Sequence, residues 1–113
     1  MRVVLIGVSH WHTPFFLDPC LELPEVRIVG VSDPDPARAE PVAAKAGCRA
    51  YGDYRELCVT ERPDFAFALA RHCDMAELAR FLIDSRVPFA MAKPCAINAA
   101  EAADIAARAR AAG

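Results

Sequence analysis

The sequence predicts an α/β fold: a doubly wound parallel sheet with helices on both faces, which gives three layers (α/β/α) in a single domain. Short runs of β-branched and aromatic residues alternate with alanine-rich amphipathic stretches along the chain, a pattern typical of β-α-β units. The runs are continuously apolar, as strands that are covered on both faces require. The length of 113 residues fits one domain, since domains commonly contain about 100 to 150 residues.

Five strands are predicted, each a short apolar run that ends at turn-forming residues. They cover Val3–Ile6, Val26–Val31, Arg49–Tyr51, Phe65–Ala70 and Val87–Met91. Parallel strands place their carboxyl ends at one edge of the sheet, and open α/β sheets bind ligands at that edge. Candidate binding residues are therefore expected directly after the strands.

Prolines shape the two helices predicted between the first three strands. The first helix begins at Thr13-Pro14, with proline in the first turn, where its missing N–H costs nothing. Pro19 and Pro24 should keep this helix short. The second helix begins at Asp35-Pro36, and Pro41 lies beyond its first turn, where it should bend or shorten the helix.

Glycine and capping residues mark the other helix ends. Gly47 is a suitable C′ residue for the second helix. The three later helices each follow a capping-box spacing. These are Asp53 with Glu56 ahead of a short helix through Leu57, Asp74 with Glu77 ahead of a helix through Ile83, and Asn98 with Glu101 ahead of Ala99–Ala112.

Composition excludes several classes of partner and location. A formal net charge of -2 gives no electrostatic reason to expect nucleic acid or an anionic membrane as a partner. No apolar run approaches the roughly 20 residues of a membrane-spanning helix, and no secretory signal follows Met1, so a cytoplasmic protein is expected. The five cysteines include no C-x-x-C pair, which favours small buried thiols over disulfides or a zinc site.

The turn after the first predicted strand is the first candidate binding site. A dinucleotide fingerprint has glycine at its first, third and sixth positions, and here Gly7, Ser9 and His12 occupy them. Ser9 is small, and its hydroxyl could donate to a phosphate at the following helix N-terminus. His10 lies in the same turn, and Trp11 either forms a wall of the nucleotide pocket or packs. The alternative is a purely structural strand-to-helix turn.

Asp33 is the second candidate, because it ends the second strand about 20 residues after the fingerprint, where a carboxylate accepts from the ribose hydroxyls of a dinucleotide. A carboxylate there repels a 2′-phosphate, so NAD is favoured over NADP. Arg38 on the following helix would soften that preference. The alternative is that Asp33 begins an Asp-Pro-Asp-Pro turn and caps a helix.

Lys93-Pro94 is the third candidate, directly after the fifth strand. Lysine is rare in this arginine-biased chain, and an ammonium here could bind a substrate hydroxyl or carbonyl and assist proton transfer. The alternative is a solvated surface lysine. A metal site is not expected: His10, His12 and the His72-Cys73 pair have no third carboxylate or thiol at a recognisable ligand spacing.

These residues, in this order, resemble the N-terminal half of the glucose-fructose oxidoreductase, inositol dehydrogenase and MocA family. The resemblance spans essentially the whole chain and is carried by Val3–Gly7, Val29–Ala39, Tyr51–Leu57 and Met91–Pro94. It implies a Rossmann domain that binds NAD(P), with Lys93 as the lysine of the Glu-Lys-Pro motif, near the nicotinamide and the substrate. Ser9 and His12 depart from the family's glycine pattern, Ala92 stands in place of the motif's glutamate, and Met75 stands where the family often has histidine.

The resemblance also implies a partner domain. Members of that family have a second α/β domain that supplies the substrate pocket, the usual catalytic histidine and much of the oligomer interface. The 113 residues correspond to the cofactor-binding domain alone, which is expected to bind the dinucleotide without turnover and to act on a sugar, polyol or similar small hydroxy compound only with the second domain. Apolar surface left for that domain would favour a homo-oligomer. The alternative function is a non-catalytic binding or association module that has lost the cofactor.

Overall fold

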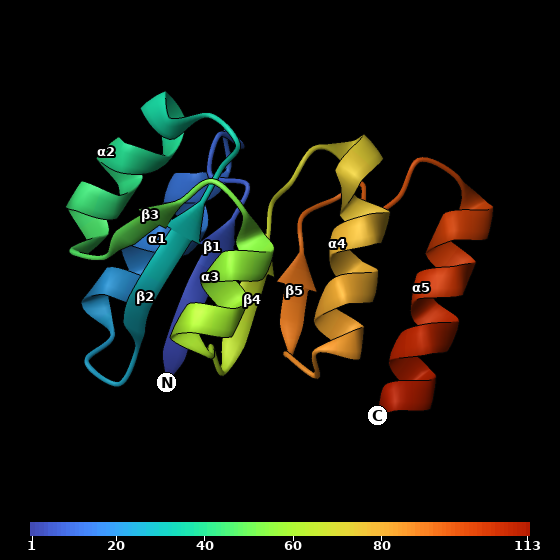
Figure 1. The fold of residues 1–113 in the computed structure, drawn as a ribbon. Coiled ribbons are helices and arrows are strands. Elements are labelled where there is room, and N and C mark those ends of the chain that lie inside the picture. The colour runs from blue at the N-terminus through green and yellow to red at the C-terminus, as the bar shows by residue number, and fades with distance from the viewer.

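The computed structural model describes residues 1–113 and contains one sheet in which all neighbouring strands are parallel. The strands are β1 (Arg2–Ile6), β2 (Arg27–Ser32), β3 (Arg49–Tyr51), β4 (Phe65–Ala68) and β5 (Phe89–Met91). The helices are α1 (Thr13–Glu22), α2 (Pro36–Ala46), α3 (Tyr54–Glu61), α4 (His72–Asp84) and α5 (Ala99–Ala112). The strand order β3-β2-β1-β4-β5 (Figure 1) confirms the predicted doubly wound α/β fold.

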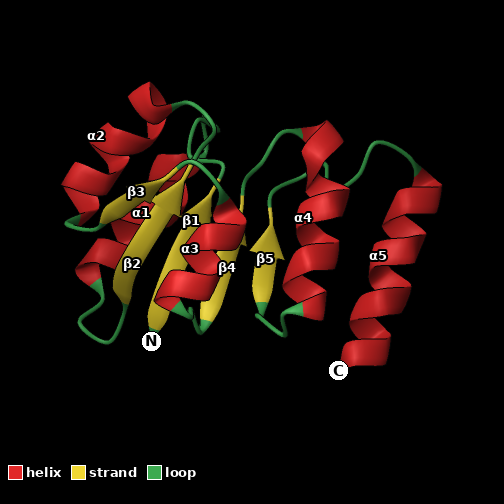
Figure 2. Ribbon diagram, viewed as in Figure 1, coloured by secondary structure: helices red, strands yellow, loops and turns green.

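The central strand β1 forms the middle of the core. Val3, Val4, Leu5 and Ile6 are each no more than 2% exposed, because helices cover both faces of the sheet. In Figure 2, α1 lies behind the sheet and α3 lies in front of it. Each such side chain contributes roughly 1.5–3 kcal/mol when it is fully buried. The continuously apolar strand is therefore a consequence of this two-sided burial.

Helix α5 packs against α4 at the outer side of the molecule (Figure 2). Ile105 is its one buried residue and contacts Ala76 and Ala79 of α4. An ion pair adds to this contact, since Arg80 Nε donates to Asp104 Oδ2 at 2.9 Å. The small alanine side chains allow the two helices to lie close together.

Pro19 does not end α1 and Pro41 does not shorten α2, because both helices run through these prolines. Helix α1 does end at Glu22, two residues before Pro24. A proline leaves the carbonyl four residues earlier without its N–H donor. Phe15 and Ala37 carry these carbonyls, and both residues are exposed. Water can replace the missing donor at both positions, which lowers the cost of a proline on the solvent side.

Helix α4 begins earlier than its capping spacing predicted. Its N-cap is Arg71, and Asp74 lies in the first turn, where it accepts from Arg71 Nε at 2.8 Å. His72 and Cys73 therefore belong to the helix. The preceding strand β4 ends at Ala68 instead of Ala70, since the chain turns away from the sheet where the Ala70 backbone lies against Gly7.

The bounds of four other elements differ from the prediction. Strand β1 (Arg2–Ile6, predicted Val3–Ile6) begins one residue earlier, and β2 (Arg27–Ser32, predicted Val26–Val31) is shifted by one residue. Helix α3 continues past Leu57 to Glu61, and it ends where Arg62 takes a left-handed conformation (φ 45°) ahead of a proline. Strand β5 begins at Phe89 instead of Val87, because Pro88 has no N–H for the ladder, although its carbonyl accepts from Ala66 N at 2.9 Å. A proline lies beside the end of α3 and beside the start of β5.

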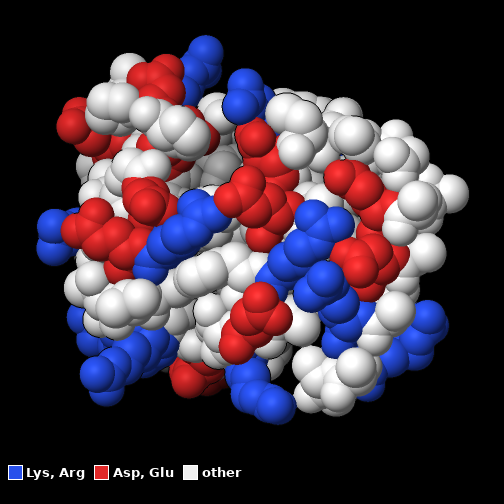
Figure 3. All heavy atoms as spheres, turned by 45° about the vertical axis from the view of Figure 1, so that its right-hand side comes forward, with Lys and Arg blue, Asp and Glu red and all other residues white.

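The surface carries charges of both signs. On the face shown in Figure 3, acidic and basic side chains are interspersed. None of the helices combines the length and the apolar character that crossing a bilayer would require. All five cysteines are free. The expectation that they are buried is wrong for Cys73 and Cys95, which are exposed because they lie at the start of α4 and in the loop after β5.

Candidate functional site

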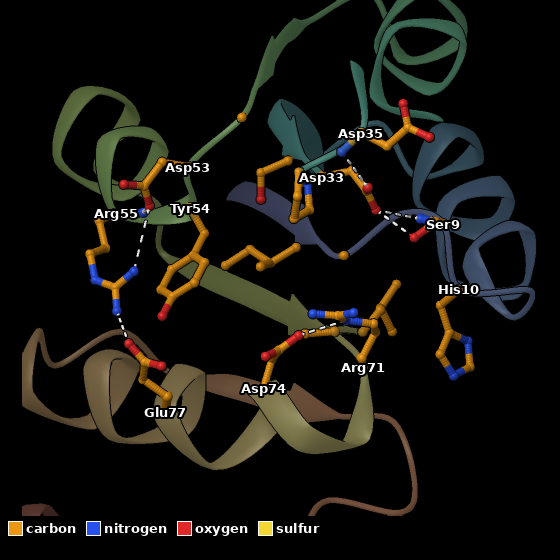
Figure 4. Close-up of a pocket in the computed structure, with 17 residues that line it drawn as sticks. Ser9, His10, Asp33, Asp35, Asp53, Tyr54, Arg55, Arg71, Asp74 and Glu77 are labelled. Atoms are coloured by element: carbon orange, nitrogen blue, oxygen red, sulfur yellow. Dashed lines mark hydrogen bonds and ion pairs between the residues drawn. The ribbon is translucent and has the colours of Figure 1, made fainter. Parts of the chain in front are cut away.

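A cavity of about 640 Å³ opens at the carboxyl edge of the sheet, where a ligand was expected. Its floor is formed by residues that end or follow β1, β2 and β4, and its sides are the first turns of α3 and α4 (Figure 4). Four of the predicted site residues line it: Gly7, Ser9, His10 and Asp33. They come from two segments that meet because β1 and β2 are neighbours in the sheet.

Gly7 forms the turn that leads out of β1. Its φ is +84°, and a Cβ built on it would lie 2.6 Å from the backbone N and Cα of Ala70. Its N–H donates to Ser32 O at 2.8 Å, and Leu69 N donates to Ile6 O at 2.7 Å. These two hydrogen bonds hold the end of β1 against β2 on one side and against the segment after β4 on the other. Only glycine fits this position without strain.

Asp33 is 4% exposed and lies at the floor of the cavity. Its Oδ2 accepts from Ser9 N at 2.8 Å and from Ser9 Oγ at 2.7 Å, and its Oδ1 accepts from Asp35 N at 3.0 Å (Figure 4). The alternative that Asp33 caps the following helix is wrong in part: Asp33 forms the turn, but the N-cap of α2 is Asp35, which accepts from Ala37 N.

His10 lines the cavity beside the turn. Its Nδ1 accepts from His12 N at 3.0 Å, so its free ring nitrogen is Nε2. Burial, and then the neighbouring His12 and His72, lower the pKa of His10 below its usual value. A neutral imidazole is therefore favoured at this side of the site.

The remaining predicted residues lie outside the cavity lining. Trp11 is 74% exposed, and its ring centroid lies 3.7 Å from that of His12, the N-cap residue of α1. Arg38 is exposed on α2. Lys93 and Pro94 are exposed after β5 and are joined by a cis peptide bond, and the Lys93 ammonium makes no hydrogen bond or ion pair.

Sequence reasoning missed the wall of the cavity formed by α3 and α4. This wall contains two arginines held by carboxylates: Arg55 pairs with Glu77, and Arg71 pairs with Asp74. Tyr54 stands beside Arg55, whose guanidinium lies 4.6 Å from the ring centroid. The signal available in the sequence was the strand pattern, because residues after the third and fourth strands must reach the same edge of the sheet.

The lining is acidic on balance. It contains two arginines and the five carboxylates Asp33, Asp35, Asp53, Asp74 and Glu77. The structure brings together no group of three or more His, Cys, Asp or Glu side chains that could hold a metal ion. What the cavity offers a ligand is therefore a set of hydrogen-bond acceptors and two guanidinium groups.

A parallel sheet with a glycine turn after its first strand and a buried acid after its second defines a Rossmann-type nucleotide-binding domain. The sequence model of the oxidoreductase family with an NAD-binding Rossmann fold, Gfo/Idh/MocA, matches residues 1–113. The chain belongs to this family, which confirms the resemblance found in the sequence.

Solved structures of similar proteins agree. An oxidoreductase from Agrobacterium radiobacter, in complex with NAD+, L-tartaric acid and magnesium, is 22% identical with a TM-score of 0.91, and the match covers 99% of this chain and 33% of that one. UDP-N-acetylglucosamine 3-dehydrogenase from Acidithiobacillus ferrooxidans is 25% identical with a TM-score of 0.85, over 99% and 36%. Myo-inositol dehydrogenase from Corynebacterium glutamicum is 15% identical with a TM-score of 0.87, over 99% and 33%.

The chain thus spans about one third of the length of these structures. No curated protein sequence matches it.

Proposed function

We propose that this domain binds NAD in the cavity at the carboxyl edge of its sheet. The observation that carries the proposal is the meeting of the Gly7 turn with the buried Asp33 carboxylate at one cavity floor. In this arrangement the adenosine ribose lies at Asp33, and the pyrophosphate lies between the turn and the N-terminus of α1. Family membership supports the same assignment.

The donors and acceptors present fit a dinucleotide. Asp33 Oδ1 accepts one hydrogen bond from the protein and has room for another. At the turn, the backbone N–H of Trp11 makes no hydrogen bond, whereas the backbone N–H groups of His10 and His12 donate within the loop. The backbone N–H of Trp11, beside the cavity, is therefore the donor that this turn has free for a pyrophosphate.

NAD is proposed over NADP because of the charge of the site. A 2′-phosphate would lie next to Asp33 and Asp35, and both cavity arginines are already paired with carboxylates. Arg38, which is exposed on α2, is the arginine nearest to Asp33 in the sequence and could offset part of the repulsion between these carboxylates and a 2′-phosphate. Among similar structures both cofactors occur: GenD2 from gentamicin A biosynthesis is in complex with NAD, and KijD10 from Actinomadura kijaniata is in complex with NADP.

In the complete enzyme, we propose hydride transfer between the nicotinamide and a hydroxyl-bearing carbon of a sugar, polyol or similar compound. Bound NAD supplies the hydride acceptor. Lys93 and Pro94 lie after β5 at the same edge, and the unpaired Lys93 ammonium is free to donate a hydrogen bond to the reacting oxygen. The proton that the hydroxyl loses would pass to a base of the second domain, as the family resemblance implies. Neighbouring structures include sugar and polyol dehydrogenases about three times as long as this chain. Binding without turnover is therefore proposed for the 113 residues alone.

Calorimetric titration of the chain with NADH and, separately, NADPH tests the proposal. Saturable binding of NADH, weaker binding of NADPH and loss of NADH binding in Asp33→Ala are expected. Absence of heat with both cofactors at millimolar concentration would favour the non-catalytic binding module instead. Equal affinity for the two cofactors would contradict the role given to the acidic lining.

A further inference from the structure

Ser9 donates two hydrogen bonds to the carboxylate that is proposed to bind the ribose. Its backbone N–H lies 2.8 Å and its Oγ 2.7 Å from the same oxygen, Oδ2 of Asp33. Figure 4 shows both contacts converging on that oxygen from the turn after β1. The serine occupies a position where the dinucleotide fingerprint has glycine, and glycine has no hydroxyl to offer.

The acceptor capacity of Asp33 limits what a ribose can gain. A carboxylate has about four lone-pair sites, two on each oxygen. Ser9 fills both sites of Oδ2, and Asp35 N fills one site of Oδ1. One site is left, whereas the two hydroxyls of an adenosine ribose need two. Asp33 forms no ion pair, although the charge of Arg71 is near enough to interact with it. The three hydrogen bonds are therefore the direct contacts that satisfy the buried carboxylate.

We propose that the Ser9 hydroxyl competes with the ribose for Asp33 and thereby sets the affinity and the ribose selectivity of the site. The two donors of Ser9 differ in whether they can move away from Asp33 when a ribose binds. The backbone N–H is fixed by the turn, in which His10 N donates to Gly7 O at 3.2 Å. The hydroxyl can rotate away, because Ser9 is exposed. A ribose therefore gains its second hydrogen bond to Asp33 only by displacing the Ser9 hydroxyl.

This inference rests on the proposed function, and it reverses the expected sign of one mutation. If Ser9 donates its hydroxyl to a phosphate, Ser9→Ala weakens cofactor binding. If Ser9 competes for Asp33, Ser9→Ala frees an acceptor site and strengthens NADH binding by about tenfold, the size of one hydrogen bond to a charged group. The same variant should unfold at a slightly lower temperature without ligand, since Asp33 then loses a donor.

The test compares wild type, Ser9→Ala and the matched control Ser85→Ala, an exposed serine at the C-cap of α4. Calorimetry measures the affinities for NADH, ADP and 2′-deoxy-ADP, and thermal denaturation measures the melting temperature without ligand. Removal of the 2′-hydroxyl should cost about tenfold in Ser9→Ala and less than about threefold in wild type, where Asp33 has a single free site. Ser85→Ala should match wild type throughout.

The outcomes separate the inference from the proposed function. Tighter NADH binding by Ser9→Ala, with a larger penalty for 2′-deoxy-ADP, supports the competition. Unchanged or weaker binding, or an equal 2′-deoxy penalty in both proteins, overturns it while leaving NAD binding in place. A lower melting temperature with no gain in affinity assigns Ser9 a structural role only. Failure of all three ligands to bind to any of the proteins contradicts the proposed function and, with it, the inference.

Discussion

Replacement of Gly7 by alanine should destabilise the fold strongly, because two separate costs fall on one residue. The φ of +84° places a Cβ in the left-handed region, which costs about 1–2 kcal/mol. The Cβ would also lie 2.6 Å from backbone atoms of Ala70 and 2.7 Å from the carbonyl carbon of Leu69. Backbone cannot rotate aside as a side chain can, so overpacking adds about 1–3 kcal/mol.

The sum is a loss of about 2–5 kcal/mol in the free energy of unfolding, out of about 5–15 kcal/mol for a typical domain. In a domain of this size, each 1 kcal/mol lowers Tm by about 4 °C. We therefore expect Gly7→Ala to melt about 8–20 °C below wild type when the circular dichroism signal is followed during heating. Urea denaturation gives the free energy directly.

Gly47→Ala is the matched control for Gly7→Ala. Gly47 also has a positive φ, +68°, but a Cβ there meets nothing within 4 Å. It should therefore show the conformational cost alone, about 1–2 kcal/mol. Equal losses in the two variants would refute the reasoning, because they would show that the contact between Gly7 and Ala70 costs nothing.

Three further predictions concern titration, thiols and packing. The pKa of His10 is lowered in the folded state by burial and two nearby imidazoles. As the pH falls below the ordinary histidine pKa of about 6.5, the unfolded chain therefore binds more protons than the folded chain. Tm should consequently fall as pH is lowered through 6.5, less so in His10→Asn; a flat profile in wild type would contradict the shift. Iodoacetamide at pH 8 should modify the exposed Cys73 and Cys95 first, as read by mass spectrometry. The buried Cys58 should react last or only on unfolding, because burial raises the pKa of its thiol to about 11; early labelling of Cys58 would be inconsistent with its burial. Ile105→Ala should cost about 2–4 kcal/mol in chemical denaturation, since this side chain is the one buried residue of α5; a loss below 1 kcal/mol would show that α5 docks by other contacts.

The fold could be predicted because two-sided burial leaves a strong mark on the sequence. Arg49–Tyr51 and Ala99–Ala112 have the predicted bounds, and β1 is as continuously buried as its composition implied. Gly47 ends α2 in a left-handed conformation, as its place after the alanine-rich stretch suggested. These features depend on local pattern and on burial, and both can be predicted from the order of apolar and polar residues in the sequence.

The details of the site depend on contacts between distant residues, and local pattern does not carry those. Asp33 was predicted as a ribose acceptor, but its hydrogen bonds to Ser9, 24 residues away, follow from the packing of two turns. Likewise the pairing of Arg55 with Glu77 spans 22 residues and joins two helices across the cavity. Pro41 was misjudged for a similar reason, since its tolerance depends on which side of α2 faces water.

The most direct test of NAD binding at this cavity is a map of amide chemical shifts in labelled protein during titration with NADH. The account predicts saturable shifts concentrated at Gly7, Ser9, Trp11 and Asp33, with α5 unaffected. Shifts absent at all of these amides, or concentrated on α5 and the outer face of α4, would contradict the assignment of the cofactor site.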